Sequence, residues 1–112
     1  MPKLVIDDSV KVPVKFDINN KGKAKSFNFN VICTRLDQDE INAILKDDDA
    51  LIVDVLKRIV TDWENQPLVV DDDNKSCEFS EESFAVMLKL QGIQKIMWVS
   101  YLKEVGAKVK NL

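Results

Sequence analysis

Residues 10–18, VKVPVKFDI, decide the fold, because apolar and polar side chains alternate along them without a break. This period of two is typical of a strand with one buried face. Pro13 falls on the polar face and has no backbone N–H to donate, so we expect this strand at a sheet edge. The polar turn at 19–23 and a second alternating stretch at 27–33 predict an antiparallel partner strand that closes a β-hairpin.

The period changes at Asp37, where Glu40 follows three residues later and predicts a capped helix start. The apolar stripe of this helix consists of Ile41, Ile44 and Leu45. Three adjacent aspartates, Asp47–Asp49, then interrupt the pattern, because such residues favour turns over helix interiors. A second helix is expected from about Ala50 to Trp63, since apolar residues recur there every three or four positions.

Proline at position 67 forces the preceding residue out of the helical region, so the second helix must end before it. The remaining pattern predicts a small second hairpin and two closing helices. These elements are a hairpin of residues 68–70 and 77–79, a helix from the capping residue Ser80 to Gly92, a helix over 93–105, and a frayed basic tail at 107–112.

The fold class is therefore α+β: an N-terminal β-hairpin followed by a mainly helical region with a small second hairpin, around a single core. We expect one domain over residues 1–112, with a hairpin segment at 1–35 and a helical segment at 36–112. The composition agrees, because 112 residues that are 46% hydrophobic and 31% charged are typical of one globular domain.

The charge pattern disfavours nucleic acid as a partner. The net charge is -3, whereas phosphate binding relies on a basic face. Residues 1–35 carry seven basic and three acidic side chains, a net +4, and residues 36–112 carry nine and sixteen, a net -7. We interpret this asymmetry as attraction within the chain or toward a partner protein rather than as a nucleic-acid footprint.

The inventory of reactive side chains argues against catalysis. The chain has no histidine, which removes the commonest general base and metal ligand. Cys33 and Cys77 lack zinc-site spacing and are interpreted as buried free thiols. A calcium-loop frame starting at Asp71 fails, because Lys75 and Ser76 occupy positions where a ligand and glycine are needed. We therefore predict no enzyme, no catalytic residue, no cofactor and no metal.

No apolar run reaches the length of a membrane span, and the run at 4–6 is too short for a secretion signal. We expect a cytoplasmic protein that does not bind membranes, which agrees with unpaired thiols.

The unusual feature is an excess of large apolar residues on the last two helices. Apolar side chains cover more than one stripe of residues 93–105, so that helix is either the centre of the core or meets another chain. Methionine and aromatic residues are also enriched at protein contacts. We predict a protein-partner surface made of Phe84, Met87, Met97, Trp98 and Tyr101. The oligomeric state stays open, and a homo-oligomer is possible.

The later half of the chain resembles the tail assembly chaperones of long-tailed bacteriophages. In that family a tryptophan-ended helix leads to an acidic turn, a Phe-Ser-capped helix, a glycine break and a final helix with a Lys/Asn-rich tail. The matching residues are Trp63-Glu64-Asn65, Asp71–Asp73, Phe79-Ser80-Glu81-Glu82, Phe84, Leu88, Gly92 and Tyr101. The resemblance covers about half the chain, and the N-terminal hairpin contributes no motif to it.

This resemblance implies a noncatalytic phage morphogenesis protein in the host cytoplasm. Such a chaperone binds the tape measure protein, keeps it soluble and helps to recruit tail tube subunits, in some cases through a longer frameshifted form. Two other functions remain open: a structural phage tail or head-tail joining subunit, and a small cytoplasmic adaptor protein unrelated to phage.

Overall fold

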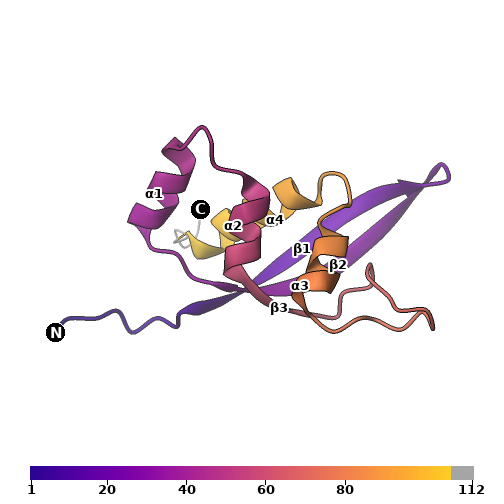
Figure 1. Cartoon of the computed structure of the whole chain (residues 1–112), viewed down its shortest axis with the longest axis horizontal. Coiled ribbons are helices and arrows are strands. Elements are labelled where there is room, and N and C mark those ends of the chain that lie inside the picture. Colours follow the sequence, from indigo (N-terminus) through magenta and orange to yellow (C-terminus); the bar gives the residue numbers. More distant parts are fainter. Residues whose placement is uncertain (107–112) are drawn as a thin grey trace, which may run out of the picture.

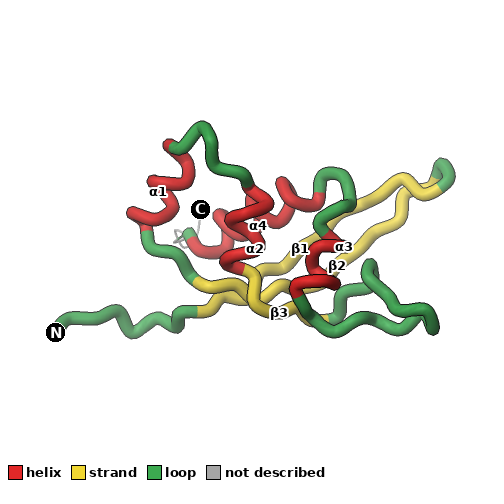
Figure 2. Tube along the Cα trace, in the orientation of Figure 1, coloured by secondary structure: helices red, strands yellow, loops and turns green. Residues whose placement is uncertain are grey.

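A three-stranded antiparallel sheet and a layer of helices make up the computed structural model, which describes residues 1–106 (Figures 1 and 2). The predicted tail at 107–112 lies outside the described residues. In chain order the elements are β1 (Ser9–Asn20), β2 (Lys23–Thr34), α1 (Gln38–Lys46), α2 (Ile52–Ile59), β3 (Val60–Glu64), α3 (Glu81–Met87) and α4 (Ile93–Val105). The strand order is β1-β2-β3. The predicted α+β class and the N-terminal hairpin are confirmed.

The hairpin buries one face, as its alternation predicts. Opposite residues on that face are Val10 and Cys33, Val12 and Val31, and Val14 and Phe29, and all six are buried. The tight turn uses positive φ at Lys21 (56°) and Gly22 (83°), which matches the right-handed twist of the strands. Pro13 is exposed on β1, an edge strand of the sheet, which confirms its predicted position.

The distal half of the hairpin extends beyond the helices (Figure 1). Its side chains are held by contacts within the hairpin: the Phe16 ring stacks on Phe27 at 5.6 Å and meets the edge of Phe29 at 6.2 Å. The Lys25 ammonium lies 5.5 Å from the centre of the Phe27 ring. Aromatic and cation–π contacts thus support a segment that the main core does not cover.

The predicted helix start at Asp37 is confirmed in detail. The Asp37 side chain accepts from the Glu40 N–H at 2.8 Å, and the Glu40 side chain accepts from the Asp37 N–H at 3.2 Å. Helix α1 ends at Lys46, immediately before the three aspartates. There the Asp47 side chain accepts from the Asp49 N–H at 2.9 Å, so the acidic stretch forms a turn as expected.

The predicted second helix is too long. Helix α2 ends at Ile59, and Val60–Glu64 form β3, which pairs with β2. The ladder has a register shift, because Cys33 pairs with Val60 and Ile32 with Asp62, which leaves Thr61 as the extra residue. Such a bulge turns residues three apart toward the same face. Val60 and Trp63 are therefore both buried, a spacing that imitates a helix.

The second hairpin is smaller than predicted. Residues 68–70 and 77–79 form no strands, and only a single bridge joins Val70 to Ser76. Helix α3 starts after the predicted cap Ser80, whose side chain accepts from the Ser83 N–H. It ends at Met87, five residues before the predicted stop at Gly92, where φ is 85° and α4 begins.

Helix α4 packs against β1 on one side and α2 on the other. Its Tyr101 side chain is buried, and the hydroxyl donates to the Thr34 carbonyl at 2.8 Å and accepts from the Leu36 N–H at 2.9 Å. Burial raises the pKa of Tyr101, so the hydroxyl keeps the proton that it donates. This residue ties the end of the hairpin to the closing helix. Within residues 1–106, no helix combines the length and apolarity needed to cross a bilayer.

We predict that Tyr101→Phe destabilises the fold by about 2 kcal/mol, because it leaves the Thr34 carbonyl and the Leu36 N–H without their shared partner while it keeps the ring. Urea unfolding at pH 7 measures the change, and an unchanged slope confirms that the two folded states are comparable. A loss below about 0.5 kcal/mol would contradict this role for the hydroxyl.

Candidate functional site

The predicted partner-binding residues are core residues. Their side chains are between 1% and 7% exposed, and they are Phe84, Met87, Met97, Trp98 and Tyr101. The prediction that they form an exposed surface is therefore corrected. For Met97, Trp98 and Tyr101 the reason is the position of α4, which has apolar contacts on two sides because it lies between β1 and α2. On α3, Phe84 packs against Trp63 and Phe79. Of the two interpretations open for this helix, the central core helix is the one that the structure bears out.

The three aromatic residues of this set make different ring contacts. Phe84 belongs to an aromatic cluster with Trp63 and Phe79, whereas Trp98 stacks on Tyr101 with 5.7 Å between ring centres. All five residues are buried in the one hydrophobic core, so they offer no open contact patch.

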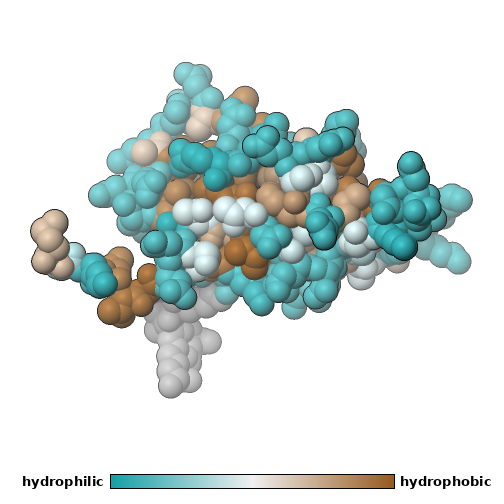
Figure 3. All heavy atoms as spheres, turned by 60° about the horizontal axis from the view of Figure 1, so that its bottom comes forward, coloured by the Kyte–Doolittle hydropathy of each residue, from teal (hydrophilic) through white to brown (hydrophobic). Residues whose placement is uncertain are grey.

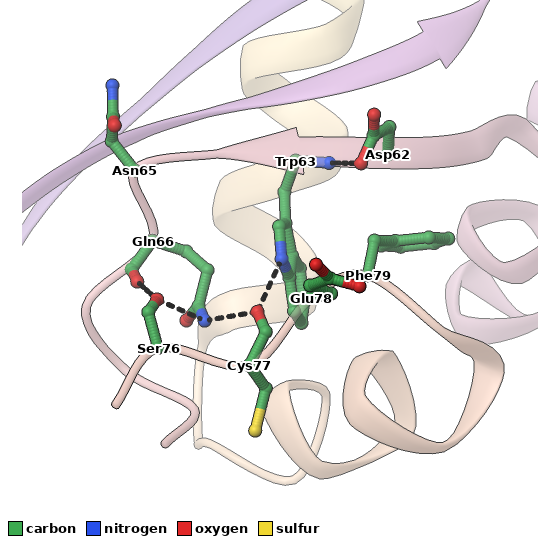
Figure 4. Close-up of a pocket in the computed structure, with 8 residues that line it drawn as sticks. All are labelled: Asp62, Trp63, Asn65, Gln66, Ser76, Cys77, Glu78 and Phe79. Atoms are coloured by element: carbon green, nitrogen blue, oxygen red, sulfur yellow. Dashed lines mark hydrogen bonds between the residues drawn. The ribbon is translucent and has the colours of Figure 1, made fainter. Parts of the chain in front are cut away.

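A pocket of about 470 Å³ opens beside the aromatic cluster (Figure 4). It is lined by Asp62, Trp63, Asn65, Gln66, Ser76, Cys77, Glu78 and Phe79. Four of its polar groups form two hydrogen bonds: the Trp63 indole N–H donates to the Cys77 carbonyl at 3.1 Å, and the Ser76 hydroxyl donates to the Gln66 carbonyl at 2.6 Å. These bonds hold the long loop after β3 against the sheet.

Gln66 is the centre of this network and is only 2% exposed. Its side-chain oxygen accepts from the backbone N–H groups of Leu68 and Val69, at 3.0 and 2.8 Å. Its amide nitrogen donates to the carbonyls of Val69 and Cys77 and to the Ser76 hydroxyl. The side chain thus replaces the ladder of the hairpin that the sequence predicts, and its role is structural.

The acidic loop is likewise held by its own backbone. The Asp71 carboxylate accepts from the N–H groups of Asp73 and Lys75, at 2.9 and 3.0 Å. This favours the solvated turn over a calcium loop. Across residues 1–106, no three Asp, Glu, His or Cys side chains are grouped as metal ligands would be.

The two thiols differ in environment. Cys33 is buried in the sheet, and burial raises its pKa to about 12. Cys77 is half-buried in the wall of the pocket. Both are free, but only the interpretation of Cys33 as fully buried is confirmed.

A second hollow of about 390 Å³ lies between α1 and α2, and we call it the α1–α2 groove. It is lined by Ala43, Ile44, Asp47, Asp49, Ala50, Leu51, Asp54, Val55 and Arg58. Its apolar part is open to solvent, since Leu51 is 60% exposed and Ala43 is also exposed. Three carboxylates and one guanidinium surround this apolar surface.

The second exposed apolar feature is the segment before β1, residues 1–8, which we call the N-terminal arm. It extends away from the body (Figure 1), and Figure 3 shows its apolar part standing clear of the main surface. Leu4, Val5 and Ile6 are 81%, 96% and 58% exposed. Contiguous exposed aliphatic residues of this kind indicate an interaction site.

The sequence contained a signal for both surfaces. Ile44 and Leu45 continue the apolar stripe of α1 beyond Ile41, the one buried residue of that helix, and Ile44 lines the groove. In the arm, three consecutive apolar residues precede the alternating strand and lie between Lys3 and Asp7. Sequence reasoning missed both because it looked for aromatic residues and methionine.

Comparison of the chain with protein-family models, curated proteins and solved structures finds no match.

We predict that Gln66→Glu destabilises the protein by roughly 3 kcal/mol at pH 7, because a carboxylate would face the acceptors that now receive the amide protons. This surrounding raises the folded-state pKa of the new carboxyl above its unfolded value near 4.3. The folded state then binds a proton that the unfolded state releases, so the destabilisation grows as pH rises from 4 to 7. Urea midpoints at both pH values test this, with exposed Gln91→Glu as control; an equal loss at both pH values would contradict it.

We predict that a disulfide reagent at pH 8 labels Cys77 in the native protein and reaches Cys33 only after unfolding. With a pKa of about 12, Cys33 has almost no thiolate at that pH, and it is also covered. When the Cys77→Ser variant is mixed with the reagent, no coloured thiol product should be released until denaturant is added. Rapid labelling of that folded variant would show that Cys33 is accessible.

Proposed function

We propose that this chain is a phage tail assembly chaperone that binds the tape measure protein, keeps it soluble in the host cytoplasm and helps to recruit tail tube subunits, without catalysis. The proposal starts from the resemblance of the second half of the chain. It gains support from the way the residues of that resemblance pack, and its binding role is carried by one observation, the open apolar surface of the α1–α2 groove.

Three of the residues that carry the resemblance pack against one another. Ring centres are 5.2 Å apart for Trp63 and Phe79, 6.3 Å for Trp63 and Phe84, and 5.5 Å for Phe79 and Phe84. Ser80, between the last two, caps α3. These residues, although separated in sequence, thus serve one local structure. Their role is to build the scaffold, so the partner surface must lie elsewhere.

The α1–α2 groove suits a helical partner. Its open aliphatic side chains can contact the apolar stripe of an amphipathic helix, which is a common mode of recognition. Asp47, Asp49 and Asp54 line it against a single basic residue, Arg58. The charge therefore favours a helix with lysine or arginine beside its apolar stripe. A tape measure protein is a long, helix-rich chain with many such stripes.

Weak, repeated binding is the mode that fits this surface. The exposed groove residues are aliphatic, whereas tight interfaces usually depend on buried aromatic or arginine anchors. Several copies bound along one tape measure chain would cover its apolar stripes and still dissociate when the tube assembles. Recruitment of tube subunits would use a longer frameshifted form, where one is made.

Co-expression with the neighbouring tape measure gene tests the proposal. We predict that the wild-type chain keeps the tape measure protein in the soluble fraction and is captured with it. Leu51→Asp, at an exposed position that lines the groove, should reduce capture about tenfold with little effect on folding. Val86→Asp, at an exposed apolar position on α3, is the matched control and should leave capture unchanged.

The outcomes test the position of the binding site and the chaperone function separately. Full capture by the Leu51→Asp variant would move the site away from the groove. A tape measure protein that stays insoluble with the wild-type chain would contradict the chaperone function. Ring-sized particles formed by the purified chain would favour a tail tube or head-tail joining subunit, and a gene neighbourhood without a tape measure reading frame would favour a cytoplasmic adaptor.

A further inference from the structure

The N-terminal arm leads into the edge strand β1 and lies past the end of β2, with bends at Ile6 and Asp8. The last backbone bond between the two sides joins the Arg35 N–H to the Asp8 carbonyl, at 2.6 Å. Residues 3–7 lie beyond it and are exposed, although three of them are aliphatic. Leucine, valine and isoleucine favour strand pairing when such a segment straightens.

The arm is complementary to itself when two copies run antiparallel. In an antiparallel pair centred on Val5, Lys3 of each copy lies opposite Asp7 of the other, and Leu4 lies opposite Ile6. Opposite charges and aliphatic pairs directly across a ladder are stabilising, whereas a parallel pair would bring like charges together. From these observations we propose that two copies of this chain associate through antiparallel pairing of their N-terminal arms about Val5.

The backbone supports the same register. Because the Asp8 carbonyl faces β2, the alternation of a strand directs the backbone groups of Lys3, Val5 and Asp7 to the open edge when the arm is drawn straight along β1. These three are the residues that exchange hydrogen bonds in a pair centred on Val5. Pro2, which has no N–H, falls at a position that donates nothing to this pairing.

The side chains are also on suitable faces. Leu4 and Ile6 are an even number of positions from Val10, Val12 and Val14. In a straight arm they would therefore lie on the same face as these residues and extend the buried face of β1. Lys3 and Asp7 share the parity of Lys11 and Lys15 on the exposed face, where ion pairs remain in water. Five residues from each copy make a small interface, so the dimer should form reversibly and depend on concentration. This proposal does not rest on the proposed function.

Sedimentation velocity of the full chain over a concentration series up to roughly 1 mM measures the association. We expect the mass to rise from that of the 12.8 kDa chain toward twice that value. Lys3→Asp alone and Asp7→Lys alone should each weaken the dimer about tenfold, because both cross-strand ion pairs become repulsive. Lys21→Asp and Asp72→Lys, which make the same charge changes at exposed positions outside the arm, are the matched controls and should leave the dimer unchanged.

Mixing gives the decisive measurement. The Lys3→Asp chain and the Asp7→Lys chain should associate with each other at least as well as the wild type does with itself, and the double variant in one chain should regain self-association. A wild type that stays monomeric throughout would overturn the proposal. A dimer unaffected by either charge reversal would also overturn the proposal, since the contact would then lie outside the arm. Ring-sized particles that persist in both variants would overturn it for the same reason.

Discussion

Burial of one face of the long hairpin is the constraint on which the rest of the structure depends. Strands β1 and β2 present a row of apolar side chains that must be covered, and α4 is the helix that packs against β1. Because α2 packs against the other side of α4, that helix must be apolar on two sides. Met97 and Trp98 are buried for this reason. Tyr101 adds the polar contact that closes the arrangement, since its hydroxyl bonds two backbone groups where the chain leaves the sheet.

Features that depend on neighbouring residues could be predicted from the sequence. The hairpin follows from an alternation repeated over two strands, and the start of α1 follows from Asp37 and Glu40, which bond each other's backbone. The bounds of α4 follow from Gly92 and Gly106. In each case the element is determined by contacts between residues that are close in sequence, so distant contacts change its position little.

Features that depend on distant contacts could not be predicted. β3 was missed because the bulge at Thr61 gives Val60 and Trp63 the spacing of a helix, and that bulge exists only in a ladder with β2. Thr61 donates its hydroxyl to the Ile32 carbonyl, 29 residues away in sequence. Gln66 is a similar case, because its buried amide bonds to groups up to eleven residues away and no pattern marks it. The spacing of three to four residues between apolar positions in this stretch fits both a helix and a bulged strand.

The location of the candidate site also depends on contacts that are distant in sequence. Aromatic residues and methionine are enriched both in cores and at protein contacts, so residue type cannot separate the two locations. Only the fold decides, and it places Phe84, Met87 and Trp98 inside. The informative signal was an apolar stripe longer than its core contact, as in α1, where Ile41 is buried and Leu45 is not.

Commitment of the aromatic residues to the core has a consequence for binding. Apart from Met1 and Pro2 in the arm, the exposed apolar residues at the groove and the arm are leucine, isoleucine, valine and alanine, which favour modest contacts. Modest contacts suffice where the target repeats, because a dimer carries two grooves and the second contact is then intramolecular. Thus the proposed dimer and the proposed groove would reinforce each other: the arm and the groove share no residue, and a long helical partner with several stripes would hold the pair more tightly than either groove alone. The same arrangement permits release, because each single contact can still open.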